Sequence, residues 1–93
     1  MVTAIINLKV NRKKINDVAT QLAEMAGITE VYSISGRFDL VALIRVENTD
    51  MIADIVTEEL LKIEGIIDSE TSIAFRCYSQ HDLEKMFSIG LED

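Results

Sequence analysis

Hydrophobic and polar residues alternate along the first ten positions, which is the period of a half-buried β-strand. One face of this strand carries Val2, Ala4, Ile6, Leu8 and Val10. From residue 11 the hydrophobic spacing becomes that of an amphipathic helix, whose inner face holds Ile15, Val18, Ala19, Leu22 and Ala23. Asn11 suits the N-cap of this helix, and Gly27 suits the C′ position that ends it.

The same types of element follow in the remainder of the chain. Residues 28–35 and 38–46 have the composition of strands, and Gly36 with Arg37 fits a tight type II′ turn between them. Asn48 or Thr49 is expected to cap a second helix, which ends at Gly65. Its inner face holds Ile52, Ile55, Val56, Leu60 and Ile63. A last strand is predicted from residue 66 to 78.

The predicted order is βαββαβ, which is typical of an α+β fold of the ferredoxin-like sandwich type. The two halves echo each other weakly, because AGITEVYSIS and EGIIDSETSI both follow a helix end. We assign residues 1–79 to this domain and residues 80–93 to a C-terminal helical tail. Ser79 is a candidate cap for the tail helix, and Leu83, Met86 and Phe87 are candidates for its apolar face.

The third strand is apolar on both faces. Leu40, Ala42, Ile44 and Val46 occupy one face, whereas Val41 and Leu43 occupy the other, as Ile5 does in the first strand. In a two-layer sandwich that second face is open to water, so these residues predict dimerisation through the sheets. The alternative is that the tail helix covers them, but the predicted apolar face of that helix offers only about three apolar side chains.

Composition and charge narrow the class of protein. The chain has 93 residues, which is one domain, and its 9 basic and 16 acidic residues give a net charge of −7 that disfavours contact with nucleic acid. A single cysteine, Cys77, and a single histidine, His81, rule out an internal disulfide and a His-rich metal site. No apolar run is long enough for a membrane span, and the basic residues follow the first apolar stretch, unlike a signal peptide. We therefore expect a cytoplasmic protein.

Catalytic signals are sparse. Phosphate-binding glycine loops, CxxC, HExxH and GxSxG motifs are absent, and Cys77 with His81 has no third group to orient it. We predict no enzyme activity, no cofactor and no metal. The acidic residues between Glu47 and Glu70 are expected mostly on the solvated face of the second helix. The basic cluster of Lys9, Arg12, Lys13 and Lys14 is interpreted as a solubilising first helical turn.

One group of residues suits a free amino acid, which presents an ammonium and a carboxylate. A turn glycine exposes backbone N–H groups, an aspartate accepts an ammonium, and hydroxyls add hydrogen bonds. These groups are Gly36, Asp39, Ser33, Ser35, Thr71 and Ser72. The alternative is an ordinary turn in which Asp39 pairs with Arg37 or Arg76, and composition alone favours it.

A resemblance to a known family favours the amino acid site over the ordinary turn. The segment from residue 28 to 75, with VYSISGRFDL followed by ETSIAF, resembles the effector-binding domain of the Lrp/AsnC regulators, also called the RAM domain. The motif V-x-x-x-x-G-x-[YF]-D is present as Val31, Gly36, Phe38 and Asp39. The motif G-[IV]-x-x-x-x-T is present as Gly65, Ile66 and Thr71. The family's aromatic before the aspartate is often tyrosine, whereas Phe38 offers a ligand no hydroxyl.

The resemblance implies a dimeric αβ-barrel in which two sheets face each other, assembled further into tetramers, octamers or rings. It also implies an effector, often an amino acid, bound near the hairpin between the second and third strands. By residue type the site carries over to Ser35, Gly36, Arg37, Phe38 and Asp39, with Thr71 and Ser72 from a neighbouring strand or subunit. Family regulators also carry a helix-turn-helix, and the chain begins at the first strand of the effector domain, so we expect no direct DNA binding.

Three functions follow from these observations. The first is an amino acid-binding oligomeric module without the DNA-binding unit, which acts on full-length Lrp/AsnC-type regulators or another partner. The second is a cofactor-free, monooxygenase-like enzyme, since dimeric αβ-barrels host such activities, but tryptophan is absent and the sole histidine is in the tail. The third is a purely structural assembly domain. The sequence barely separates the first from the third.

Overall fold

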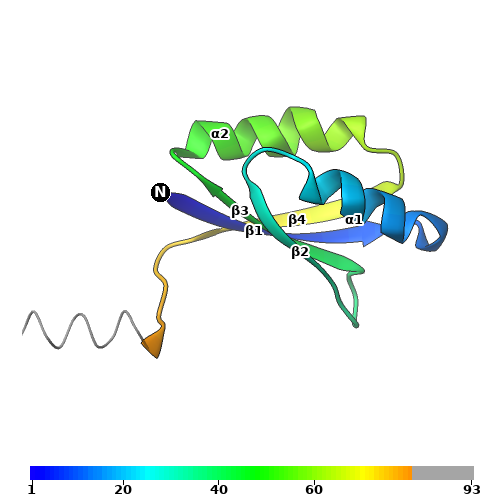
Figure 1. The fold of residues 1–93 in the computed structure, drawn as a ribbon, viewed down its shortest axis with the longest axis horizontal. Coiled ribbons are helices and arrows are strands. Elements are labelled where there is room, and N and C mark those ends of the chain that lie inside the picture. The colour runs from blue at the N-terminus through cyan, green and yellow to red at the C-terminus, as the bar shows by residue number, and fades with distance from the viewer. Residues whose placement is uncertain (81–93) are drawn as a thin grey trace, which may run out of the picture.

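The computed structural model describes residues 1–80, which form one four-stranded antiparallel sheet with helices on one face (Figure 1). The main elements are β1 (Val2–Val10), α1 (Ile15–Ala23), β2 (Ile28–Ser33), β3 (Leu40–Val46), α2 (Thr49–Asp54) and β4 (Ile66–Ala74). A 3-10 turn, η1 (Arg12–Lys14), precedes α1, and α2 continues through a π-helical turn, η2 (Ile55–Glu59), and a 3-10 turn, η3 (Leu60–Lys62). The strand order β2-β3-β1-β4 is that of the predicted ferredoxin-like α+β sandwich, which is confirmed.

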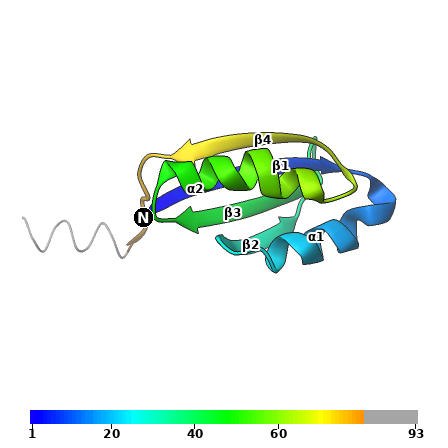
Figure 2. The same cartoon turned by 90° about the horizontal axis from the view of Figure 1, so that it is seen from above.

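The core lies between the sheet and the helices. In Figure 2, α2 runs above the central strands and α1 lies beside β2. The residues predicted on the inner face of β1, from Ala4 to Val10, and all four predicted on that of β3 are buried. The helical layer adds Val18, Leu22, Ile52, Ile55, Leu60 and Ile63. Ala23, predicted to face inward, is exposed, because the helix ends there; Met25 packs against the core instead.

Asn48 caps α2 as predicted, whereas Asn11 caps the 3-10 turn η1 and not α1, whose N-cap, Lys14, forms no side-chain capping hydrogen bond. The Asn11 side chain accepts a hydrogen bond from the Lys13 backbone N–H, and the Asn48 side chain accepts one from the Met51 backbone N–H, each at 3.0 Å. Gly27, in contrast, is not the C′ residue, because α1 ends at Ala23 and is capped at Glu24. Gly27 lies in the turn that enters β2, with φ +93°, and its carbonyl accepts a hydrogen bond from the Arg45 N–H.

The connection between β2 and β3 is longer than predicted. Residues 34–39 leave the regular strands, so the prediction of a two-residue type II′ turn was wrong. The Ile34 N–H donates to the Asp39 carbonyl at 3.0 Å, and the Asp39 N–H donates to the Leu8 carbonyl on β1 at 2.9 Å. These bonds hold both ends of the connection, while Gly36, with φ +107°, lies at its exposed tip. The six residues therefore form a loop that projects from the end of the sheet (Figure 1).

The last strand is shorter than predicted, because β4 ends at Ala74 and not at residue 78. Residues 75–79 leave the sheet as an extended segment (Figure 1). The expected tail helix, with Leu83, Met86 and Phe87, lies outside the described residues. Among residues 1–80, no helix has the length and hydropathy that crossing a membrane requires.

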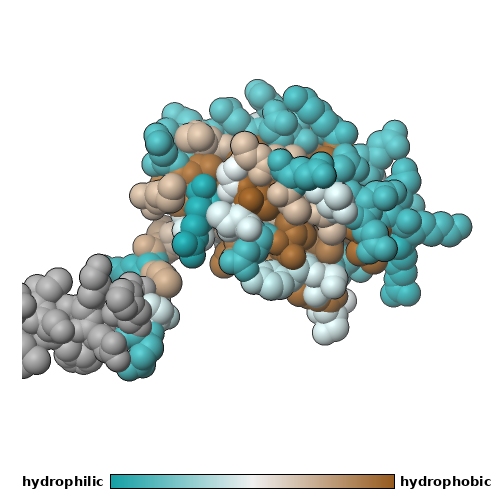
Figure 3. Space-filling model, viewed as in Figure 1, coloured by the Kyte–Doolittle hydropathy of each residue, from teal (hydrophilic) through white to brown (hydrophobic). Residues whose placement is uncertain are grey.

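No element of residues 1–80 covers the face of the sheet that points away from the helices (Figure 1). We call it the open face. The register pairs Ile5 with Leu43 and Val41 with Tyr32 on this face. Ile5, Leu43 and Val41 are half-buried, and Tyr32 is exposed. The predicted apolar positions on the open face are therefore confirmed, whereas hydrophilic residues cover the helices (Figure 3).

Candidate functional site

Strand register brings the loop of residues 34–39 close to the start of β4. Lys9 on β1 is directly opposite Asp68 on β4, and Glu70 follows two positions later on the same face. Arg37 and Phe38 approach these three residues from the loop. Together the five side chains line a hollow of about 340 Å³ at one end of the open face. We call it the loop hollow.

The loop hollow contains two cations and two carboxylates. The Arg37 guanidinium lies 3.6 Å from a Glu70 carboxylate oxygen, and the Lys9 ammonium donates to the Arg37 carbonyl at 3.5 Å. The guanidinium is also stacked over the Phe38 ring, 5.2 Å from its centroid. The Arg37 and Glu70 side chains are 81% and 60% exposed, so water screens their attraction and the pair is weak. A ligand with both charges can therefore replace this contact at little cost.

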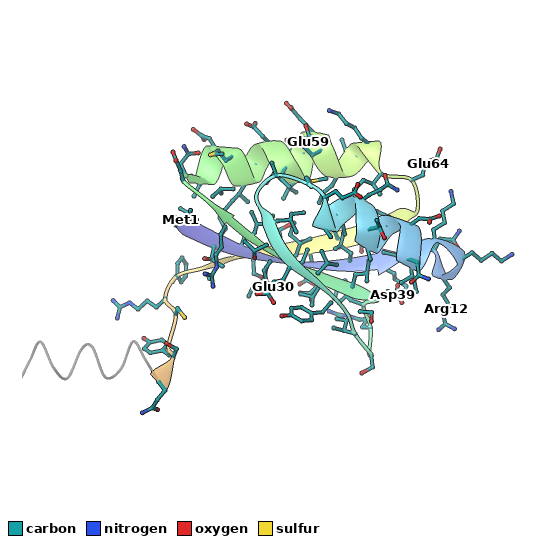
Figure 4. The ribbon with its side chains drawn as sticks, viewed as in Figure 1. Met1, Arg12, Glu30, Asp39, Glu59 and Glu64 are labelled. Carbon is teal, nitrogen blue, oxygen red and sulfur yellow. The ribbon has the colours of Figure 1, made fainter. Side chains whose placement is uncertain are left out.

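The sequence allowed two interpretations of Asp39, as an acceptor for a ligand ammonium or as a partner of Arg37 or Arg76. Its environment in the structure differs from both. One of its carboxylate oxygens accepts a hydrogen bond from the Val10 backbone N–H at 2.8 Å, and the group is partly buried. Among residues 1–80 Asp39 forms no ion pair with Arg37 or Arg76, and Arg37 contacts Glu70 instead. Figure 4 places Asp39 at the base of the loop, beside the end of β1. In this position Asp39 holds the loop against β1.

The other predicted site residues are distributed around the loop and on β4. Ser35 and Gly36 lie at the exposed tip of the loop. Ser33 is opposite Leu40, which puts its side chain on the helix side of the sheet. Ser72 is opposite Ile5 on the open face, whereas Thr71 is opposite the buried Ile6 on the helix side. Of the predicted site residues, Arg37 and Phe38 line the loop hollow within one chain. Thr71 lies on the helix side of the sheet, away from the hollow.

Sequence reasoning missed three residues of the loop hollow. Lys9 was assigned to a solubilising first helical turn, but it belongs to β1 and its side chain is on the open face. Asp68 and Glu70 were counted with the acidic run around the second helix, but they lie on β4. Strand alternation could have identified these residues. In a βαββαβ sheet the first and last strands pair, so their residues on the open face are neighbours.

Among residues 1–80, no cluster of three or more His, Cys, Asp or Glu side chains has the arrangement of a metal site. The chemistry of the loop hollow is that of opposite charges beside an aromatic ring. These are the groups that recognise a small molecule carrying both an ammonium and a carboxylate.

The fold and the sheet order place the chain among the ferredoxin-like α+β domains. Within that class it belongs to the Lrp/AsnC ligand binding domain family, whose model matches residues 3–83. The resemblance found in the loop and on β4 is therefore confirmed at the level of the family.

Solved structures share this fold, and curated proteins are similar in sequence. TTHA0845 from Thermus thermophilus is 35% identical, with a TM-score of 0.80 over 86% of this chain and 100% of that chain. The hypothetical protein PHS023 from Pyrococcus horikoshii is 27% identical, with a TM-score of 0.76 over 87% of this chain and 98% of that chain. The uncharacterized HTH-type transcriptional regulator YugG of Bacillus subtilis is 30% identical over 99% of this chain and 56% of its own length.

The curated relatives are longer than the matched region. The chain covers 39% of the uncharacterized HTH-type transcriptional regulator PF0250 of Pyrococcus furiosus, to which it is 32% identical over 63% of its own residues. It thus spans from about two fifths to just over half of the regulators it matches. Both of these relatives are named as transcriptional regulators and not as enzymes.

Proposed function

We propose that this chain is a small-effector-binding module of the Lrp/AsnC type, that its effector is an amino acid, and that the loop hollow is the binding site. The observation that carries the proposal is the arrangement of charges. Two cations, Lys9 and Arg37, and two carboxylates, Asp68 and Glu70, line one hollow of about 340 Å³. That volume is within the range of small-molecule sites, at its lower end, which fits a compact ligand.

The charges suggest how a free amino acid is held. Its carboxylate pairs with the Arg37 guanidinium and the Lys9 ammonium, which are the cations of the hollow. Its ammonium pairs with the carboxylates of Asp68 and Glu70, and its side chain packs against the Phe38 ring. Among proteins of the same fold, the regulator NMB0573 of Neisseria meningitidis was solved as an L-Met complex. That precedent supports an amino acid as the class of ligand.

The remaining predicted residues complete the site in the proposal. Gly36 and Ser35 offer backbone N–H groups at the loop tip, and Asp39 fixes the base of the loop. Ser72 lies on the open face with Glu70, two positions further along β4. Thr71 lies on the other face, so we place its contribution, with that of Ser33, in a site shared with a neighbouring subunit.

The proposed assembly is a homodimer through the open face, which forms an αβ-barrel and associates further into tetramers, octamers or rings. The support is the apolar centre of that face, where Ile5, Val41 and Leu43 meet no covering element in residues 1–80. A small domain also gains core by such pairing. An effector bound between subunits then shifts the assembly by its different affinity for each state.

The proposed role is to modulate a full-length Lrp/AsnC-type regulator or a similar partner in the cytoplasm. The net charge of −7 argues against contact between this domain and DNA. A structural assembly domain without a ligand is the second candidate, because the same apolar open face supports it. A monooxygenase-like enzyme has no supporting observation in residues 1–80.

A thermal-shift screen of the twenty amino acids, followed by light scattering on each hit, tests the proposal. A ligand at a hundredfold excess over its dissociation constant adds about 2.7 kcal/mol to the stability of the native state. A selective shift supports the effector module and names the amino acid, and a change of mass shows the coupling to assembly. A stable oligomer without any shift contradicts the effector proposal and favours the assembly domain.

A further inference from the structure

Two hollows lie along the seam between the helices, on the opposite side of the sheet from the open face. The first, of about 190 Å³, is lined by Ala26, Gly27, Val46, Met51, Asp54 and Ile55. The second, of about 300 Å³, is lined by Gln21, Glu24, Met25, Glu59, Lys62 and Ile63. The turn of residues 24–27, which rises to α2 in Figure 1, contributes to both, so the hollows adjoin each other. We call them together the helical groove, and the proposed dimer through the open face leaves it uncovered.

The helical groove has an apolar floor with a methionine in each hollow. Met51 is 42% exposed in the first hollow, and Met25 is half-buried in the second. The buried Ile55 and Ile63 lie beside them. A methionine side chain is flexible and polarizable, so it adapts to an apolar side chain from a partner. The first hollow is smaller than the sites that hold small molecules, and its size suits a single side chain.

The distance between the two hollows matches the repeat of a helix. Ile55 and Ile63 are eight residues apart on the continuous helix from α2 to η3, which is about 12 Å at a rise of about 1.5 Å per residue. Two apolar residues seven or eight positions apart on a partner helix share one face and have nearly the same separation. The groove therefore suits an amphipathic helix that inserts one apolar side chain into each hollow.

Carboxylates border the helical groove. Glu24 and Asp54 line it and form no ion pair within residues 1–80, whereas Glu59 pairs with Lys62. Glu58, exposed on the same helix, also forms no ion pair in this part of the chain. Lysine or arginine on a partner helix would complement these charges.

A second copy of the chain is a poor occupant of the helical groove. Its net charge is also −7, so two copies repel each other at long range. Its exposed basic cluster is η1 (Arg12–Lys14), which consists of arginine and lysine and offers no apolar side chain to either hollow. The charges and the apolar floor together therefore favour a different protein.

We propose that the helical groove binds an amphipathic helix of a partner protein, which presents two apolar side chains seven or eight positions apart with lysine or arginine beside them. This proposal goes beyond the effector module, because the groove shares no lining residue with the loop hollow and lies on the other side of the sheet. Failure of either proposal leaves the other standing.

The test titrates the isotope-labelled full chain with a synthetic alanine-rich helical peptide that carries two leucines seven positions apart and flanking lysines. We expect saturable amide NMR shifts at Met25, Ala26 and Met51. One control peptide has glutamate in place of each lysine, and another has alanine in place of each leucine. Each control should bind about tenfold more weakly or worse, since one loses the complementary charge and the other loses the apolar contacts.

Two variants with matched controls locate the binding. Ala26→Phe fills the first hollow and should lower affinity by about tenfold or more, whereas Ala53→Phe, exposed on α2 and outside both hollows, should retain it. Asp54→Asn should lower affinity by about two- to fivefold at low salt, and Asp17→Asn, exposed on α1 outside the groove, should not. The amide spectrum of each free variant shows whether its fold is intact.

The outcomes separate the alternatives. Equal binding of the glutamate peptide would overturn the choice of a basic partner. Equal binding of the alanine peptide, normal binding by a folded Ala26→Phe variant or absence of saturable shifts would overturn the groove. So would shifts confined to Ile5 and Leu43 on the open face. A mass that rises with concentration in the native chain and not in Ala26→Phe would make a second copy the occupant and overturn the partner helix.

Discussion

The Asp39 carboxylate accepts a hydrogen bond from the Val10 backbone N–H at 2.8 Å, and this bond links the loop of residues 34–39 to the end of β1. The bond lies beside the β-bulge between Lys9 and Val10, where regular pairing of β1 with β4 is interrupted. It satisfies a backbone N–H of β1 that lies beyond Leu8, where the pairing of β1 with β3 ends. It also keeps the loop next to Lys9, so that residues of both segments line the same hollow.

Replacement of Asp39 by alanine should lower the free energy of unfolding by about 1–3 kcal/mol, because the partly buried Val10 N–H loses its acceptor. Asp39→Asn is the matched control, since its side-chain oxygen still accepts and the loss should be about 1 kcal/mol or less. Urea unfolding at one protein concentration measures both variants. Equal losses in the two variants would show that the hydrogen bond does not stabilise the fold.

Replacement of Leu43 by glutamate should disrupt the proposed dimer. Leu43 lies opposite Ile5 at the apolar centre of the open face, so a carboxylate there would be buried without a partner in a sheet-to-sheet interface. Light scattering at micromolar concentration should report monomer. Leu61→Glu is the control, because Leu61 is 80% exposed on η3 and its variant should retain the mass of the native chain. A Leu43→Glu variant with native mass would place the interface elsewhere.

Much of the fold was predictable, because the buried face of each strand or helix holds hydrophobic residues at the spacing of that element. The alternation in β1 and β3 and the inner face of the second helix were all confirmed. Boundaries were less accurate where hydrogen bonds, and not hydropathy, decide the end of an element. Phe38 and Asp39 fit a strand pattern, but the Asp39 N–H and side chain bind β1, and β3 begins at Leu40.

The candidate site was predictable only in part, because it depends on strands that are distant in the sequence. Arg37 and Phe38 were predicted because they belong to a local sequence motif in the loop. Lys9, Asp68 and Glu70 reach the same hollow through the pairing of β1 with β4, and a local pattern does not carry that information. The face of Thr71 likewise follows from its register with Ile6.

Arg37→Gln and Glu70→Gln should each weaken binding of the identified amino acid by about tenfold, which is about 1.4 kcal/mol. Each variant removes one of the charges that hold the ligand. Stability should change by less than about 0.5 kcal/mol, because the pair between Arg37 and Glu70 is exposed. Lys62→Gln is the control for a lost charge, since Lys62 pairs with Glu59 on the helical layer. Titration calorimetry gives the affinities, and unchanged binding in both site variants would remove the loop hollow from the proposal.

Alanine at two glycines should separate backbone strain from packing. Gly27 and Gly36 have φ values of +93° and +107°, a region that side chains disfavour by about 1–2 kcal/mol. A Cβ at Gly27 would also lie 2.9 Å from a Val46 methyl and 3.0 Å from the end of Ile55, whereas a Cβ at Gly36 meets nothing within 4 Å. Overpacking in a core costs a further 1–3 kcal/mol or so. Gly27→Ala should therefore lose about 2–5 kcal/mol of unfolding free energy and Gly36→Ala about 1–2 kcal/mol. Urea unfolding of both variants measures the difference, and equal losses would mean that Val46 and Ile55 move aside without cost.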